Sequence, residues 1–264
     1  MHILSVCDTE GLLLFATTCS LMRSAVAAEF RIRLAMLLVP FFGNRIRHWN
    51  GLLRLHGAVV SGSVALALFL SPIDWVPGDL DVYVGDQAFL PFVTDLERLF
   101  PVVLEADMTR RHPGIYTGIK RVRRYKTATG KRLEVIQSRS SSSVAPLLYF
   151  WSSLVMNFIT PHRAVCAFPK HTLSRAGLIT DANLHMKAQC AREKYKDRGI
   201  SFIENETWRP GGGQQSEQGP VFSDGPLLIV DLRTVWSNKQ RPLPIRRVGS
   251  KWTVTYPPAG EPGE

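Results

Sequence analysis

Two aspartates in the sequence DLDVYV are spaced so that both can act on one ligand. Asp79 and Asp81 lie two residues apart in a run whose Leu, Val and Tyr residues are typical of a strand. Because side chains at i and i+2 of a strand point to the same face, the two carboxylates are expected to converge. Mg²⁺, which prefers one or two carboxylates plus phosphate oxygens, would relieve the repulsion between them. A solvated strand edge or a turn is the open alternative.

A glycine and a serine upstream, Gly62 and Ser63, are of types suited to binding phosphate. They follow the short apolar run AVVS and precede VALALFL, at an expected strand-to-helix turn. Glycine lets a phosphate approach the main chain, and the free N–H groups at a helix start attract an anion. Alone, the pair is more typical of a glycine turn with a serine N-cap. Combined with Asp79 and Asp81, it indicates a site for a phosphorylated substrate.

The order of these motifs resembles the nucleotidyltransferase fold, the superfamily of DNA polymerase beta, in which a hydrophobic-Gly-Ser turn precedes an Asp-x-Asp strand. More narrowly, GS…PGDLDxYV followed by VMNFIT is similar to a group of basidiomycete fungal proteins. The resemblance covers about residues 52–199. It implies that Gly62 and Ser63 bind phosphate, and that Asp79 and Asp81 bind metal at a nucleoside triphosphate. It also implies a third carboxylate that activates the attacking hydroxyl, so that a nucleoside monophosphate is transferred to an acceptor.

Glu134 in RLEVIQ is the candidate for that third carboxylate, as a metal ligand and catalytic residue, because it lies among apolar residues on an expected strand. Glu105 and Asp107 in VVLEADM compete with it. Pairing of Glu134 with a nearby arginine is an equally open interpretation. Since the third position is Glu rather than Asp, the alternative function is a catalytically inactive module of the same fold that binds a nucleotide or nucleic acid.

Much of the positive charge lies in one segment. The net charge is +10, and KRVRRYKTATGKR, residues 120–132, carries seven Lys or Arg and no carboxylate. Transfer of phosphoryl or nucleotidyl groups depends mainly on positioning and charge neutralisation, so Arg123, Arg124 and Lys126 are expected to bind substrate phosphate. The same segment predicts contact with nucleic acid. A solvated strand face is the alternative, because alternate strand residues must point outward.

The elements expected around these residues form an α/β (α+β) domain, a nucleotidyltransferase-like mixed sheet with flanking helices. Strands are expected at AVVS, DLDVYV and PVVLEADM, and in two hairpins, YTGIKRVRRYKT with KRLEVIQS and VMNFIT with AVCAFP. Helices are expected at RIRHWNGLLRLHG, VALALFL, AFLPFVTDLERLF, VAPLLYFWSS and TDANLHMKAQCAREKYKDRG.

Three parts are expected along the chain. Residues 1–42 form a helical segment, residues 43–200 the nucleotidyltransferase-like domain, and residues 201–264 a linker, a strand candidate in GPLLIVDLRTVW and a disordered tail. The sequence ILSVCDTEGLLLFATTCSLMRSAV is faintly similar to the later part of an F-box, the helical module that docks onto a Skp adaptor. A protein-interaction role with a Skp-type partner is therefore a second alternative, although packing of these helices against the main domain is favoured.

No membrane contact and no zinc site are expected. Charged residues interrupt the apolar stretches 12–22 and 34–42, and the N-terminus lacks the pattern of a secretory signal. An intracellular location, cytoplasmic or nuclear, follows as an expectation. The four cysteines lie far apart and show no zinc-ligand spacing.

Overall fold

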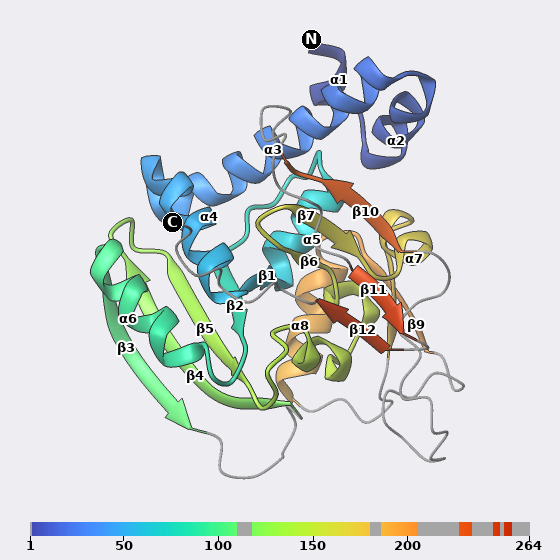
Figure 1. Cartoon of the computed structure of the whole chain (residues 1–264). Helices are drawn as coiled ribbons and strands as arrows, with labels where there is room; N and C mark the ends of the chain where they lie inside the picture. Colours follow the sequence, from blue (N-terminus) through green and yellow to red (C-terminus); the bar gives the residue numbers. More distant parts are fainter. Residues whose placement is uncertain are drawn as a thin grey trace.

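A mixed sheet of eight strands organises the chain (Figure 1). The computed structural model describes residues 2–109, 118–179, 186–204, 227–233, 245–248 and 251–254. The sheet has the order β10-β7-β6-β1-β2-β5-β4-β3, in which β2 and β5 are parallel and the other neighbours antiparallel. Its strands are β1 (Val59–Ser61), β2 (Asp79–Val84), β3 (Val102–Thr109), β4 (Ile119–Thr127), β5 (Arg132–Ser138), β6 (Phe158–Ile159), β7 (Arg163–Cys166) and β10 (Leu228–Asp231).

Helices flank this sheet, and two small sheets accompany it. The α-helices are α1 (His2–Val6), α2 (Thr9–Thr18), α3 (Ser20–Phe42), α4 (Ile46–His56), α5 (Gly62–Leu70), α6 (Phe89–Leu99), α7 (Pro169–Leu173) and α8 (Met186–Lys196). Short 3-10 helices are η1 (Gly43–Arg45), η2 (Ala145–Tyr149) and η3 (Ser153–Val155). The small sheets pair β8 (Ala176–Ile179) with β9 (Ser201–Glu204) and β11 (Ile245–Val248) with β12 (Lys251–Val254). The predicted fold class, a mixed α/β sheet with flanking helices and an N-terminal helical segment, is confirmed.

The largest core lies between one face of the sheet and helices α3 to α6. Leu80 and Val82 of β2 are buried in this core, whereas Tyr83 belongs to a second cluster on the opposite face. Asp79 and Asp81 have the same strand parity as Tyr83, so they point away from the helical layer. The period of the strand therefore directs both carboxylates to one face, as the sequence predicts.

A buried arginine ties the N-terminal helices to the rest of the fold. Arg33 of α3 pairs with Glu29 at 2.9 Å and donates hydrogen bonds to the carbonyls of Leu4, Cys7 and Ser71. A single guanidinium thus joins α1, α3 and the end of α5. The F-box-like docking role and the three-part division of the chain stay predictions.

One predicted helix is wrong. The segment VAPLLYFWSS forms only the 3-10 helix η2, and Phe150 then adopts extended backbone with ψ of 148°. Ser152 makes an antiparallel bridge with Ile179 of β8, so pairing with a distant strand outweighs the local helical composition. His112, Tyr116, Thr180, Asp181, the linker 209–220 and the tail 256–264 lie outside the described residues. Within the described part of the chain, no helix is long and apolar enough to cross a membrane.

Candidate functional site

The turn from β1 into α5 places Gly62 against Asp81. Ser61 of β1 is in register with Asp81 of β2, and Gly62 has a φ of +67°, a conformation that L side chains rarely adopt. A Cβ atom on Gly62 would overlap Oδ2 of Asp81 and lie 3.2 Å from its Cγ. Glycine is therefore required here by the backbone conformation and by the close approach of the carboxylate.

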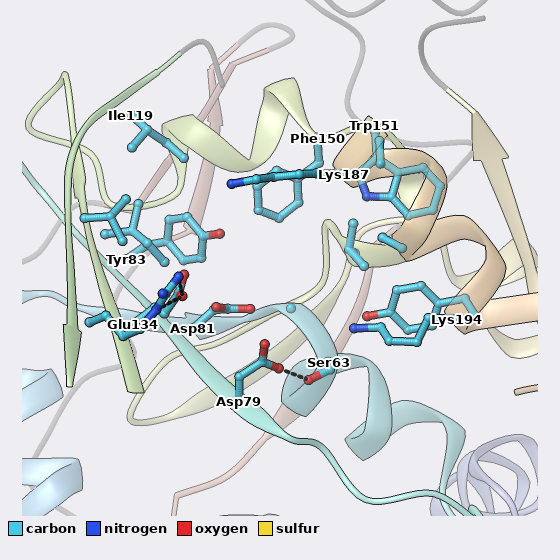
Figure 2. Close-up of a pocket in the computed structure, with 18 of the residues that line it drawn as sticks. Ser63, Asp79, Asp81, Tyr83, Ile119, Glu134, Phe150, Trp151, Lys187 and Lys194 are labelled. Carbon is cyan, nitrogen blue, oxygen red and sulfur yellow. Dashed lines mark hydrogen bonds and ion pairs between the residues drawn. The ribbon is translucent and has the colours of Figure 1, made fainter. Parts of the chain in front are cut away.

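Three carboxylates and a hydroxyl lie side by side at this point. Ser63 Oγ donates a hydrogen bond to Asp79 Oδ1 at 3.3 Å, and the parallel register of β2 and β5 places Glu134 beside Asp81. Figure 2 shows Asp79, Asp81 and Ser63 directed toward one space. The structure therefore brings together the predicted phosphate turn, the predicted metal pair and the predicted third acid.

These groups line a cavity of about 240 Å³. Helix α8 forms another wall, with Lys187 and Lys194 (Figure 2). Tyr195 of the same helix also lines the cavity. Phe150 and Trp151 supply an aromatic wall. The cavity therefore combines an acidic floor, two ammonium groups and flat apolar surfaces.

Burial perturbs the acid at the centre of the floor. The pKa of Asp81 is raised well above its ordinary value, first by burial and then by the negative charges of Asp79 and Glu134, while Lys194 lowers it. The pKa of Tyr195 is also raised by burial and by the charge of Asp81. Burial and the two neighbouring carboxylates thus act against the charged form of Asp81, and a bound cation would act in its favour.

Glu134 pairs with a strand arginine, the interpretation that the sequence leaves open. Arg124 Nε and Nη2 lie 2.9 Å and 2.8 Å from Glu134 Oε1, and both residues line the cavity. Among the residues that the structure describes, no group of three acidic, histidine or cysteine side chains is arranged to hold a metal ion. Asp79 and Asp81 alone fit the smaller ligand set with which Mg²⁺ bridges a protein to phosphate.

The other predicted basic residues lie outside the cavity. Arg123 points to the opposite face of β4, where its Nε lies 2.9 Å from Asp107 Oδ2 and its Nη1 3.5 Å from Glu97 Oε1. Lys126 is exposed and does not line the cavity. Adjacent strand residues alternate between faces, so Arg123 and Arg124 cannot both reach one site. Asp107, another candidate for the third carboxylate, on β3, forms ion pairs with Arg121 and Arg123.

The contribution of α8 to the cavity was not predicted from the sequence. Lys187, Ala191 and Lys194 are spaced i, i+4 and i+7, so they share one helix face. Between the two ammonium groups, this face of α8 carries only the short side chains of Ala188 and Ala191. This spacing is visible in the sequence, but only the fold shows that the face closes a cavity floored by β2.

No protein-family model matches this chain, and no curated protein matches it. Among solved structures, a CCA-adding enzyme in complex with CTP is 13% identical with a TM-score of 0.42, over 65% of this chain and 43% of that chain. The Thermotoga maritima CCA-adding enzyme complexed with tRNA is 16% identical with a TM-score of 0.42, over 65% of this chain and 42% of that chain. This chain thus spans less than half the length of either enzyme.

Proposed function

We propose that the protein is a metal-dependent nucleotidyltransferase that moves a nucleoside monophosphate from a nucleoside triphosphate to an acceptor hydroxyl. The observation that carries the proposal is the meeting of Gly62 and Ser63 with Asp79 and Asp81 in one cavity. A helix start attracts phosphate, and a pair of carboxylates attracts the cation that accompanies a triphosphate.

The acidic floor fits a magnesium ion. Asp79 and Asp81 would hold it together with substrate phosphate oxygens, and the raised pKa of Asp81 supports a site whose negative charge lacks a partner. When bound, the ion neutralises charge on the triphosphate. Glu134 is paired with Arg124, so it would become a third metal ligand only after this ion pair had broken.

The chain's own residues would divide the remaining work. The main-chain N–H groups at Gly62 and Ser63 would bind the triphosphate, and Lys187 and Lys194 would offset the charge of the departing pyrophosphate. Trp151 would contact the base.

Glu134 would accept the proton of the acceptor hydroxyl. This role requires that Arg124 move from Glu134 to substrate phosphate, a partner that guanidinium groups bind strongly. Such an exchange would couple arrival of the triphosphate to release of the Glu134 carboxylate as the base.

Release of pyrophosphate from each of the four ribonucleoside triphosphates, with and without Mg²⁺, tests the proposal. The Asp79→Asn/Asp81→Asn variant should lose release, whereas Asp197→Asn, which changes an exposed acid on a loop, should not. Release that is equal in wild type and double variant would refute the assignment of these carboxylates.

A non-catalytic module that binds a nucleotide or nucleic acid is the second candidate. The Arg124–Glu134 ion pair favours it, because this pair removes the third acid from the site. Triphosphate binding that depends on Mg²⁺ and on Asp79 and Asp81, without pyrophosphate release under any condition, would select this candidate.

A further inference from the structure

A second concave surface, lined by helices α3 and α4, carries an excess of positive charge. Its volume is about 600 Å³, and four arginines line it: Arg31 of α3, Arg47 and Arg54 of α4, and Arg233, the second residue after β10. None of its described lining residues is acidic. We propose that this arginine groove binds the sugar-phosphate backbone of a nucleic acid strand.

One face of α4 builds the floor of the arginine groove. Arg47, Asn50, Gly51 and Arg54 are spaced i, i+3, i+4 and i+7, and all four are exposed. At 1.5 Å per residue, Arg47 and Arg54 start about 10 Å apart along the helix. This separation suits successive phosphates of a chain better than one small anion.

The charges of the arginine groove are largely free to act on a ligand. In the described part of the chain, Arg47 and Arg54 make no hydrogen bond or ion pair, and both are exposed. Arg31 donates to the carbonyl of Arg233 at 2.9 Å, which brings α3 and the end of β10 together. Among the described arginines of the groove, Arg233 is the one that donates hydrogen bonds to an acid, Asp231.

The positive charge of the arginine groove acts on His162, one of the residues that line it. The pKa of His162 is lowered, first by its partial burial and then by the positive charges of Arg54 and Arg233, while Asp231 opposes the shift. The surrounding charge therefore disfavours a further cation, which is the property of a surface that attracts anions.

The basic hairpin of β4 and β5 differs in this respect. Four of its cations pair with acids: Lys120 with Asp86, Arg121 and Arg123 with Asp107, and Arg124 with Glu134. Four of the seven cations of residues 120–132 are thus paired with acids, whereas Arg47 and Arg54 of the arginine groove have no acidic partner among the described residues.

Gly51 supports close approach of a ligand to α4. A glycine inside a helix costs about 1 kcal/mol relative to alanine, yet a Cβ at Gly51 would meet no atom within 4 Å. Packing within the chain therefore does not require glycine at this position. Its absent side chain leaves the backbone open between Arg47 and Arg54, where a sugar-phosphate chain would lie.

The lining chemistry indicates backbone contact rather than base recognition. Planar guanidinium groups match phosphate oxygens, and no Phe, Tyr or Trp is among the described residues that line the groove. A strand bound here would have no stacking platform for its bases, so binding should tolerate any sequence. The groove lies on the helical side of the sheet, opposite the face to which Asp79 and Asp81 point, and does not depend on the proposed transfer reaction.

Fluorescence anisotropy of a labelled single-stranded RNA, titrated with the full chain without Mg²⁺ or nucleotide, tests the arginine groove. The Arg47→Gln/Arg54→Gln variant should weaken binding about ten-fold and reduce the slope of log affinity against log salt by about 1.4, or about 0.7 for each lost phosphate contact. The matched Lys126→Gln/Arg132→Gln variant removes two exposed cations of the hairpin and should bind within about two-fold of wild type. Absence of binding, or a greater loss in the hairpin variant, would overturn the proposal.

Competitors identify the ligand class. Unlabelled RNA should displace the probe, whereas inorganic phosphate and a poly-glutamate peptide at equal charge should not; equal displacement by either would overturn assignment to a nucleic acid backbone. Gly51→Ala should weaken binding while raising the melting temperature, and unchanged RNA affinity would refute close approach at Gly51. The Asp79→Asn/Asp81→Asn variant should bind RNA as wild type does, which separates failure of this proposal from failure of the transferase proposal.

Discussion

Replacement of Gly62 by alanine should damage the fold and the site together. An L residue in the left-handed conformation that Gly62 adopts costs about 1–2 kcal/mol. The new Cβ would also overlap Asp81 Oδ2, and forcing such an overpacked contact costs about 1–3 kcal/mol more. The free energy of unfolding should therefore fall by about 2–5 kcal/mol, with about 2–4 °C of melting temperature lost per kcal/mol.

A matched glycine separates these two costs. Gly130, in the turn between β4 and β5, has a φ of +78°, but a Cβ there would meet no atom within 4 Å. Gly130→Ala should therefore cost only the backbone strain, about 1–2 kcal/mol. Urea unfolding followed by circular dichroism measures both variants on one scale.

A double-mutant cycle tests whether the cost of Gly62→Ala beyond backbone strain arises from contact with Asp81. The Asp81→Ala variant lacks the two carboxyl atoms that would be closest to the new Cβ, so Gly62→Ala in that background should cost no more than Gly130→Ala. Equal costs of Gly62→Ala in the wild-type and Asp81→Ala backgrounds would refute the contact between the phosphate turn and the metal pair.

Three further predictions concern charges of the cavity. Because burial raises the pKa of Asp81 in the folded state, its contribution to stability is full below the ordinary carboxyl pKa and is lost as pH rises through the raised value. Asp81→Asn should therefore melt at a higher temperature than wild type at neutral pH, and the difference should shrink toward acid pH; a difference independent of pH would contradict the raised pKa. Glu134→Gln should retain triphosphate binding by calorimetry but slow pyrophosphate release about 10²–10⁴-fold, and an unchanged rate would exclude Glu134 as the base. Lys194→Gln should weaken triphosphate affinity about ten-fold, whereas Lys196→Gln, which changes a lysine paired with Glu193, should not.

The phosphate turn and the metal pair could be predicted because local rules determine both. The strand period places Asp79 and Asp81 on one face, and a Gly-Ser pair between an apolar strand and an apolar helix is recognisable over a few residues. The remaining features of the site depend on the register between strands. Whether Arg123 or Arg124 faces the cavity depends on how β4 pairs with β5, which the composition of a basic run does not determine.

Contacts between distant segments account for the features that the sequence did not reveal. Helix α8 reaches the cavity from more than a hundred residues after β2, and the arginine groove joins α3, α4 and the two residues after β10. The predicted helix at VAPLLYFWSS was lost to pairing between Ser152 and Ile179. In each case the arrangement depends on contacts with a segment far away in the sequence, so the local sequence does not reveal it.

Calorimetric titration of the four ribonucleoside triphosphates into the full chain, with and without Mg²⁺, is the most direct test of the site. We predict binding that strengthens with Mg²⁺ in wild type and loses that dependence in the Asp79→Asn/Asp81→Asn variant. Affinity that is the same with and without Mg²⁺, or the same in both proteins, would contradict a metal–nucleotide site built on these two carboxylates.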